Sequence, residues 1–268
     1  MAGRDVRPAD APTISSGYAR PVPETIGAVV ARMEAGLAEL GGDARRFFHA
    51  TYLRTTRAVA DEIDRGGFAD GEWLERWDIA FANLYLDALA ADQRGEEVPG
   101  PWRVAFDAAR DRPGLPPLRH VLFGMNAHIN YDLPQALLAV ISPAEFDDPV
   151  VRASRAADHT HVDDVLLGRV SAEDAELETI APPTLVDRLL RPANRASTRR
   201  FLAESRAKVW HNTRVLDRAR RSSPPHYRSV LADLEALCVA RLADLTRPGF
   251  VLLRLARRGF GVRLPDEV

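Results

Sequence analysis

The chain has 268 residues, of which 46% are hydrophobic and 28% are charged, a composition typical of a soluble globular protein. Its formal net charge of -2 provides no electrostatic basis for binding nucleic acid. Cys238 is the single cysteine, which excludes an intrachain disulfide and a zinc site built from cysteines.

Residues 1–23 form a polar lead that we expect to be disordered or loosely docked. This lead lacks the apolar core of a signal peptide, and no run of about 18 apolar residues occurs in the chain. The sequence therefore predicts a cytoplasmic protein without a transmembrane segment. It contains no glycine-rich phosphate loop and no dinucleotide-binding fingerprint, so no nucleotide cofactor is expected.

From residue 24 onward, apolar residues recur at spacings of three and four, the pattern of helices with one buried face. Asp43 and Asp70 are predicted to begin the second and third helices, and glycine pairs follow the first and second. The first four predicted helices cover residues 24–40, 43–64, 70–94 and 102–110. A fifth helix follows two consecutive prolines, and Pro134 within it predicts a kink or a break.

The rest of the chain is also predicted to be helical, and no alternation of useful length indicates a strand. Helices are expected after a cap at Ser142, over 149–170, over 171–190 with a break at 181–183, from Asn194 or Ser197 to Arg221, and after Pro224. Residues 246–268 form a basic amphipathic tail, for which docking on the bundle is favoured over contact with a membrane surface. The predicted fold class is all-α, with residues 24–268 forming a single-domain antiparallel helical bundle of about eight to ten helices.

The stretch Gly124–Pro134 carries the strongest functional signal in the sequence. His128 and Asp132 are four residues apart and therefore share one helix face. Burying either group unpaired is costly, so the pair needs each other, a metal or a bound ligand as a partner. Three neighbours in the same stretch are candidate ligand-pocket residues: Asn126, Asn130 and Tyr131.

The same spacing returns at His159 and Asp163. Imidazole and carboxylate groups are the usual ligands of zinc, iron and manganese, and a helical bundle can direct them inward from facing helices. We therefore expect a divalent metal held by both pairs, with Asp78 or His49 completing the shell or orienting a metal-bound water. The candidate metal ligands are His128, Asp132, His159 and Asp163, and the candidate catalytic residues are His128, Asp132, Asp78 and His49.

Two further interpretations involve no metal. Trp77 and Phe81 belong to an aromatic stripe that either packs in the core or lines an apolar pocket. In the second case His128 and Asp132 would orient a small apolar metabolite, or act as an acid–base dyad that helps to cyclise it. The simplest alternative is a structural protein in which these polar groups only satisfy one another.

The arginines of the predicted helix that ends at Arg221 are most simply a solvated face. Two of them, Arg206 and Arg214, are candidates to face an acidic ligand instead.

Three segments, Phe48–Thr56, Trp77–Tyr85 and Gly124–Pro134, resemble a family of bacterial all-helical proteins known as a domain of unknown function. The resemblance covers most of residues 24–245. It implies a helical fold and a shared pocket, and it implies no activity.

A second, local resemblance is to the zinc-dependent phospholipase C and single-strand nuclease superfamily, which is all-helical. His128, Asp132 and Pro134 match its pattern of a His/Asp pair followed by proline, and His159 with Asp163 can match a second pair. The amino-terminal tryptophan ligand of that superfamily has no counterpart here. This resemblance implies metal-dependent hydrolysis of a phosphoester, which is the leading functional hypothesis, with a small-molecule substrate.

Overall fold

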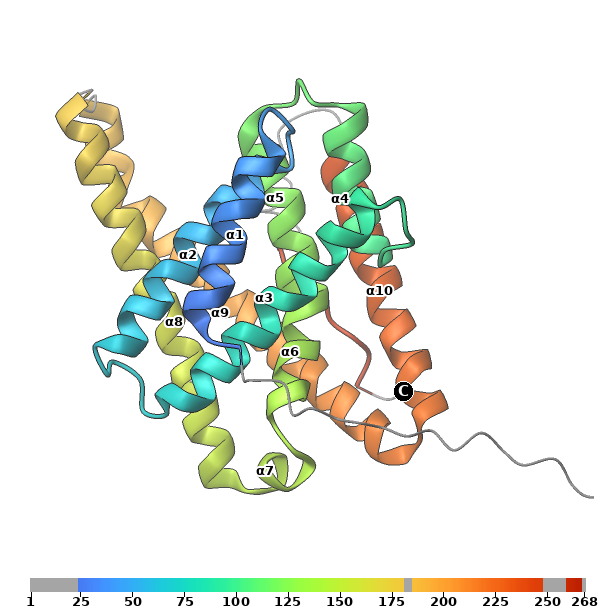
Figure 1. Ribbon diagram of the computed structural model, residues 1–268. Coiled ribbons are helices and arrows are strands. Elements are labelled where there is room, and N and C mark those ends of the chain that lie inside the picture. Colours follow the sequence, from blue (N-terminus) through green and yellow to red (C-terminus); the bar gives the residue numbers. More distant parts are fainter. Residues whose placement is uncertain (1–23, 181–184, 248–258, 267–268) are drawn as a thin grey trace, which may run out of the picture.

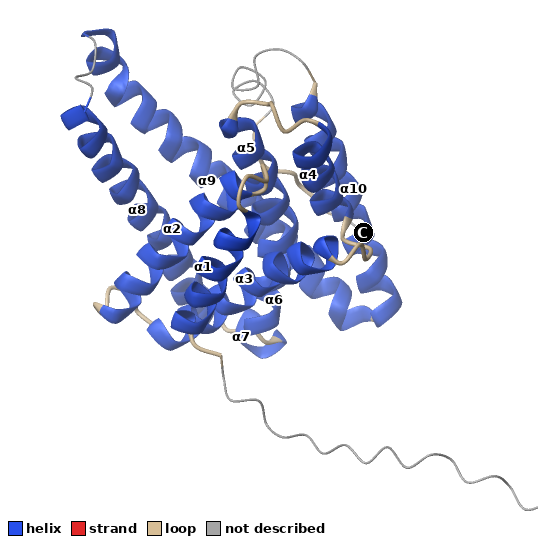
Figure 2. Ribbon diagram, turned by 45° about the horizontal axis from the view of Figure 1, so that its top comes forward, coloured by secondary structure: helices blue, strands red, loops and turns tan. Residues whose placement is uncertain are grey.

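The helical spacing of apolar residues is realised as helices along the chain. The structure is a computed structural model that describes residues 24–180, 185–247 and 259–266. Side chains are described for these residues except those within 166–202. The described residues contain no strand, and Figure 2 shows helices joined by short loops. The elements are α1 (Ile26–Leu40), α2 (Arg46–Asp64), α3 (Gly71–Gln93), α4 (Gly100–Asp111), α5 (Pro117–Ala127), the π-helix η1 (His128–Asp132), α6 (Leu133–Val140), α7 (Pro143–Asp147), α8 (Pro149–Ile180), α9 (Leu185–Ser222) and α10 (Pro224–Thr246).

Local side-chain chemistry sets several of the helix starts. The side chain of Thr25 accepts the backbone N–H of Ala28 at the start of α1, and Asp70 accepts that of Trp73 at the start of α3. Ser142 and Glu145 form a reciprocal capping box at the start of α7. These caps supply acceptors for backbone donors that the first helical turn leaves unpaired. The predicted all-α fold class and the start of α3 are confirmed.

The segment made of α5, η1 and α6 runs through the middle of the bundle (Figure 1). It packs against α2, α3, α4, α9 and α10, so its side chains meet residues from most of the fold. Around it, α1 packs on α2 and α3, and α9 packs on α10. The stretch that carries the strongest sequence signal therefore occupies the most enclosed position.

The interruption expected near Pro134 takes the form of a π-helix. The N–H of Leu133 donates to the C=O of His128, five residues earlier, instead of four. Pro134 has no N–H to offer to the carbonyl four residues before it, and its ring would clash with that carbonyl in a regular helix. A widened turn avoids this clash, and such turns occur often at functional sites. His128 and Asp132 stand at the two ends of this turn.

The expected bounds differ from the structure at three helices. α2 begins at Arg46, with no side-chain cap, and not at Asp43. α8 continues to Ile180, past the expected end near Val170, and α9 is unbroken from Leu185, so no helix starts at Asn194 or Ser197. The two helices pack against each other, and partner contacts of this kind maintain helices that local sequence alone does not favour. The break expected at 181–183 lies outside the described residues.

An extended segment, residues 259–266, packs into the bundle after the last helix. Phe260, Val262 and Leu264 are buried, with Phe260 completely enclosed. The side-chain amide of Asn212 on α9 donates to the C=O of Val262 at 3.0 Å and accepts the N–H of Leu264 at 2.9 Å. This part of the expected tail therefore docks on the bundle, whereas residues 1–23 and 248–258 lie outside the described range.

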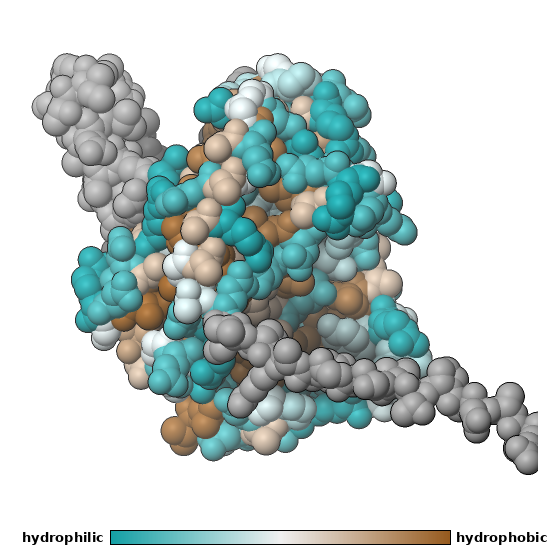
Figure 3. All heavy atoms as spheres, viewed as in Figure 1, coloured by the Kyte–Doolittle hydropathy of each residue, from teal (hydrophilic) through white to brown (hydrophobic). Residues whose placement is uncertain are grey.

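The face shown in Figure 3 is mostly hydrophilic, and its hydrophobic residues occur in small separate patches. Across the described side chains, the large hydrophobic residues that are exposed are Leu118, Val150 and Leu237. No helix in the described residues is long and apolar enough to span a membrane.

The contact between α2 and α5 gives a test of the fold. A Cβ atom added at Gly124 would lie 2.2 Å from Cγ of Phe48. We expect Gly124→Ala to lower the free energy of unfolding by about 1–3 kcal/mol, the usual cost of overpacking, even though alanine favours helix by about 1 kcal/mol. Denaturant unfolding measures this change. Gly114→Ala is the matched control, because a Cβ there meets nothing within 4 Å. Equal stability of the two variants would contradict the packing.

Candidate functional site

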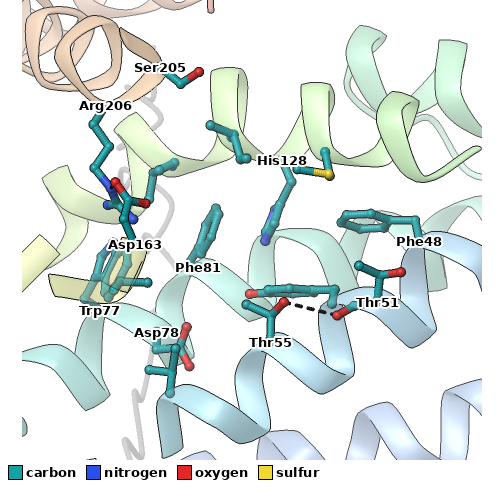
Figure 4. A pocket seen from close by; sticks show the side chains of 16 residues that line it. Phe48, Thr51, Thr55, Trp77, Asp78, Phe81, His128, Asp163, Ser205 and Arg206 are labelled. Atoms are coloured by element: carbon teal, nitrogen blue, oxygen red, sulfur yellow. Dashed lines mark hydrogen bonds and ion pairs between the residues drawn. The ribbon is translucent and has the colours of Figure 1, made fainter. Parts of the chain in front are cut away.

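A cavity of about 130 Å³ lies where α2, α3, η1, α8 and α9 meet. Most of its wall is apolar or aromatic. The residues that line it are Phe48, Thr51, Tyr52, Thr55, Val59, Trp77, Asp78, Phe81, Met125, His128, Ile129, Leu133, Val162, Asp163, Ser205 and Arg206. Figure 4 shows His128 and Phe81 entering this space from the central segment and from α3. A concave, mostly apolar space with a few polar groups is the usual form of a small-molecule site.

His128 is held in this wall by aromatic rings. Its imidazole stacks on Phe81 with the ring centroids 3.6 Å apart and an angle of 3° between the planes. Tyr52 meets the imidazole edge-on at 4.4 Å. The side chain is only 2% exposed, so these contacts and its hydrogen bond to Asp132 fix its orientation.

Asp132 determines which nitrogen of His128 carries the proton. His128 Nδ1 lies 2.9 Å from Asp132 Oδ2, and the indole N–H of Trp102 donates to the same oxygen at 2.9 Å. Because that oxygen is an acceptor, we assign the imidazole proton to Nδ1 and a free lone pair to Nε2. Burial lowers the pKa of His128, which keeps the ring neutral. Burial raises the pKa of Asp132, and the hydrogen bond from Trp102 opposes that rise.

Several polar groups in the cavity wall have an atom without a hydrogen-bond partner among the described residues. Among them are Nε2 of His128, Oδ2 of Asp78 and the hydroxyl of Tyr52. Burial raises the pKa of Asp78 to about 7, and burial together with the nearby Asp78 raises the pKa of Tyr52. A neutral imidazole and a carboxyl group that titrates near neutrality therefore share one apolar cavity, the arrangement used for acid–base chemistry.

The second His/Asp pair does not form. His159 Nδ1 accepts the indole N–H of Trp210 at 3.1 Å, and its ring lies edge-on to Trp77. Asp163 Oδ2 lies 2.5 Å from Nε of Arg206. Of the two residues, only Asp163 lines the cavity.

His49 lies outside the cavity lining and has both nitrogens engaged. Nε2 donates to the C=O of Met33 at 2.7 Å, and Nδ1 accepts the hydroxyl of Tyr85 at 2.9 Å. These bonds join α1, α2 and α3 and engage both nitrogens of His49, and its catalytic role stays a prediction from the sequence.

The metal ligands expected from the sequence are not brought together. In the part of the chain that the structure describes, no three His, Cys, Asp or Glu side chains are placed to hold a metal ion. His128 and Asp132 bind each other, and Asp163 pairs with an arginine. These donors do not fit a metal centre, and metal-dependent hydrolysis remains a prediction from the sequence alone.

A comparison with protein families gives one match. The profile of a family of unknown function, DUF5995, matches residues 26–248, which include every residue that lines the cavity. The chain belongs to this family. The match confirms the resemblance noted for residues 24–245. No curated protein matches the chain, and no solved structure matches it either.

The polar neighbours of His128 serve a different part of the DUF5995 fold. Asn126 and Asn130 donate to the C=O of Phe260 at 3.2 Å, and Asn130 also accepts the N–H of Val262. Neither of them lines the cavity, and Tyr131 does not either, whereas Trp77 and Phe81 do. The alternation of Phe260, Val262 and Leu264 could have indicated this segment, but the prediction of an amphipathic tail did not use it. The cavity positions of Tyr52 and Ser205 had no local signal.

The network around Asp132 predicts a large loss of stability on substitution. Asp132→Leu leaves the N–H groups of His128 and Trp102 buried without an acceptor, which should lower the free energy of unfolding by about 3–5 kcal/mol. The double variant His128→Leu/Asp132→Leu removes one of these donors and should recover at least about 1 kcal/mol. Urea denaturation of the three proteins tests both numbers. Wild-type stability in Asp132→Leu would show that the network is not formed.

Asp78 predicts a specific dependence of stability on pH. A pKa raised from 3.8 to about 7 means that the native state holds this proton more tightly than the unfolded chain. The contribution of protonated Asp78 to the free energy of unfolding is therefore full below about pH 4. It declines by up to about 4 kcal/mol as the pH rises to about 7. Asp78→Asn cannot titrate, so the stability difference between wild type and variant should follow this curve. A difference that is constant from pH 4 to 8 would refute a buried, titrating Asp78.

Proposed function

We propose that the protein binds a small, largely apolar molecule in this cavity, and that the His128–Asp132 pair accepts a hydrogen bond from it. The observation that carries the proposal is the unpaired Nε2 of His128, which lies in the cavity wall with its tautomer set by Asp132. A buried acceptor without a partner lowers the free energy of unfolding by about 1–3 kcal/mol. A ligand that donates a hydrogen bond to this acceptor would recover that loss.

The cavity limits the size of the ligand. A dry engineered cavity of about 150 Å³ in another protein holds benzene, and the cavity here is about 130 Å³. A single ring or a short branched chain with one polar substituent is therefore the class of molecule that fits. Stacked aromatic side chains in the wall favour a planar, apolar body.

The polar groups give the site a capacity for proton transfer. If the ligand carries an acidic proton, Nε2 of His128 can remove it, and Asp132 would stabilise the imidazolium that forms. Asp78 has a pKa of about 7 and can take or return a proton near neutral pH. The imidazole alone is a weak base because burial lowers its pKa. Binding is therefore the primary function proposed, and acid–base catalysis follows for a ligand that is sufficiently acidic.

A comparison of phenol with toluene tests the acceptor role of His128. Phenol offers an O–H to Nε2, whereas toluene has the same ring and no donor. We expect His128→Phe, which retains an aromatic ring against Phe81, to lower the affinity for phenol about 5- to 30-fold. The affinity for toluene should change little. Calorimetric titration measures both affinities.

The same titrations include a chelator as a control. Binding through His128 requires no metal, so excess EDTA should leave the affinity for phenol unchanged. Absence of binding of both compounds to the wild-type protein would refute the proposed function, and loss of phenol binding with EDTA would restore the metal hypothesis.

A further inference from the structure

The cavity has a second polar end, formed by two consecutive residues of α9. Ser205 and Arg206 both line the space, and Ser205 is only 3% exposed. The hydroxyl of Ser205 and Nη1 of Arg206 have no hydrogen-bond partner among the described residues. In Figure 4, Arg206 and Asp163 lie on the opposite side of Phe81 from His128. The aromatic body of the cavity thus separates an acceptor end from a donor end.

Arg206 is already partly neutralised. Its Nε lies 2.5 Å from Oδ2 of Asp163, and Nη1 has no hydrogen-bond partner among the described residues. A guanidinium presents its N–H groups in a planar fork and pairs two oxyanions at once, which an ammonium group does less well. The hydroxyl of Ser205 is a further unpaired donor in the lining of the same cavity. A charged donor and a neutral one can both serve a carboxylate, which offers two acceptor oxygens.

The surrounding charges distinguish between anions. Asp163 and Asp78 both line the cavity, and Arg206 is the single cation among its lining residues. A dianionic phosphate would face two carboxyl groups with one shared arginine, and like charges at such distances are unfavourable. A carboxylate carries one charge and is smaller, which also suits a cavity of about 130 Å³.

We infer that the ligand of this cavity is a small apolar monocarboxylate, with its carboxylate held by Ser205 and Arg206 and its ring or chain against Phe81 and Trp77. The inference rests on the proposed function, because it assigns a substrate class to the same cavity. His128 and Asp78 then face the part of the ligand remote from the carboxylate.

Matched acids and alcohols test the inference. Benzoate, phenylacetate and 3-phenylpropionate are titrated at pH 7.5 beside benzyl alcohol, 2-phenylethanol and 3-phenylpropanol, which have the same apolar bodies. We expect the best acid to bind wild-type protein at least tenfold more tightly than its alcohol. Arg206→Gln would leave Asp163 without a partner, so the double variant Asp163→Asn/Arg206→Gln replaces the ion pair with a neutral pair of similar shape.

The double variant should lose at least tenfold in affinity for the acid and change less than twofold for the alcohol. Ser205→Ala, a smaller change, should weaken the acid about threefold to tenfold. Circular dichroism confirms that each variant is folded. Equal affinities for acids and alcohols in the wild type, or an unchanged acid affinity in both variants, would overturn the carboxylate assignment and leave the proposed function standing. If acids, alcohols and phenol all fail to bind, the proposed function itself fails.

Discussion

The buried hydrogen bonds of Asp132 are the constraint on which the centre of this protein depends. One carboxylate oxygen receives N–H groups from His128 and from Trp102, and so connects the π-helix with α4. Pro134 requires the wide turn, and the wide turn places the His/Asp pair where α3, α9 and α10 converge. The imidazole can then stack on Phe81 in only one orientation, with one nitrogen in the cavity. Backbone geometry, core packing and the chemistry of the site follow from the same few atoms.

The cavity combines features that do not favour stability. Unpaired atoms of His128, Asp78, Ser205 and Arg206 face a small apolar space, and each buried polar atom without a partner lowers the free energy of unfolding. Elsewhere in the core some comparable groups are satisfied, as the two hydrogen bonds of His49 show, whereas others, such as the indole N–H of Trp73, have no partner among the described residues. Proteins concentrate such unfavourable groups at functional sites, because a ligand can satisfy them. The unpaired atoms around the cavity are the observation that supports the binding proposed for it.

The sequence predicted the features that neighbouring residues determine, such as helices and one helix cap. It missed the side-chain contacts that residues distant in the chain determine. Helical periodicity and the cap at Asp70 are local, and they gave the fold class and the start of α3. The His128–Asp132 pair is also local, because four residues of helix bring the two side chains together. The identical spacing at His159 failed, because its ring binds a tryptophan 51 residues away on α9. The roles of Asn126 and Asn130 required a segment more than 100 residues later, which no local pattern connects to them.

The extended segment at residues 259–266 has a consequence for how the chain matures. The side-chain amides of Asn130 and Asn212 each donate to one backbone C=O of this segment and accept one backbone N–H, as a neighbouring strand would. Phe260 is fully buried. This segment follows every helix in the order of synthesis. The groove that receives it therefore stays open to water until residues 259–266 have been synthesised. A protein fused directly after this segment would be attached to residues that pack in the core and not to an exposed tail.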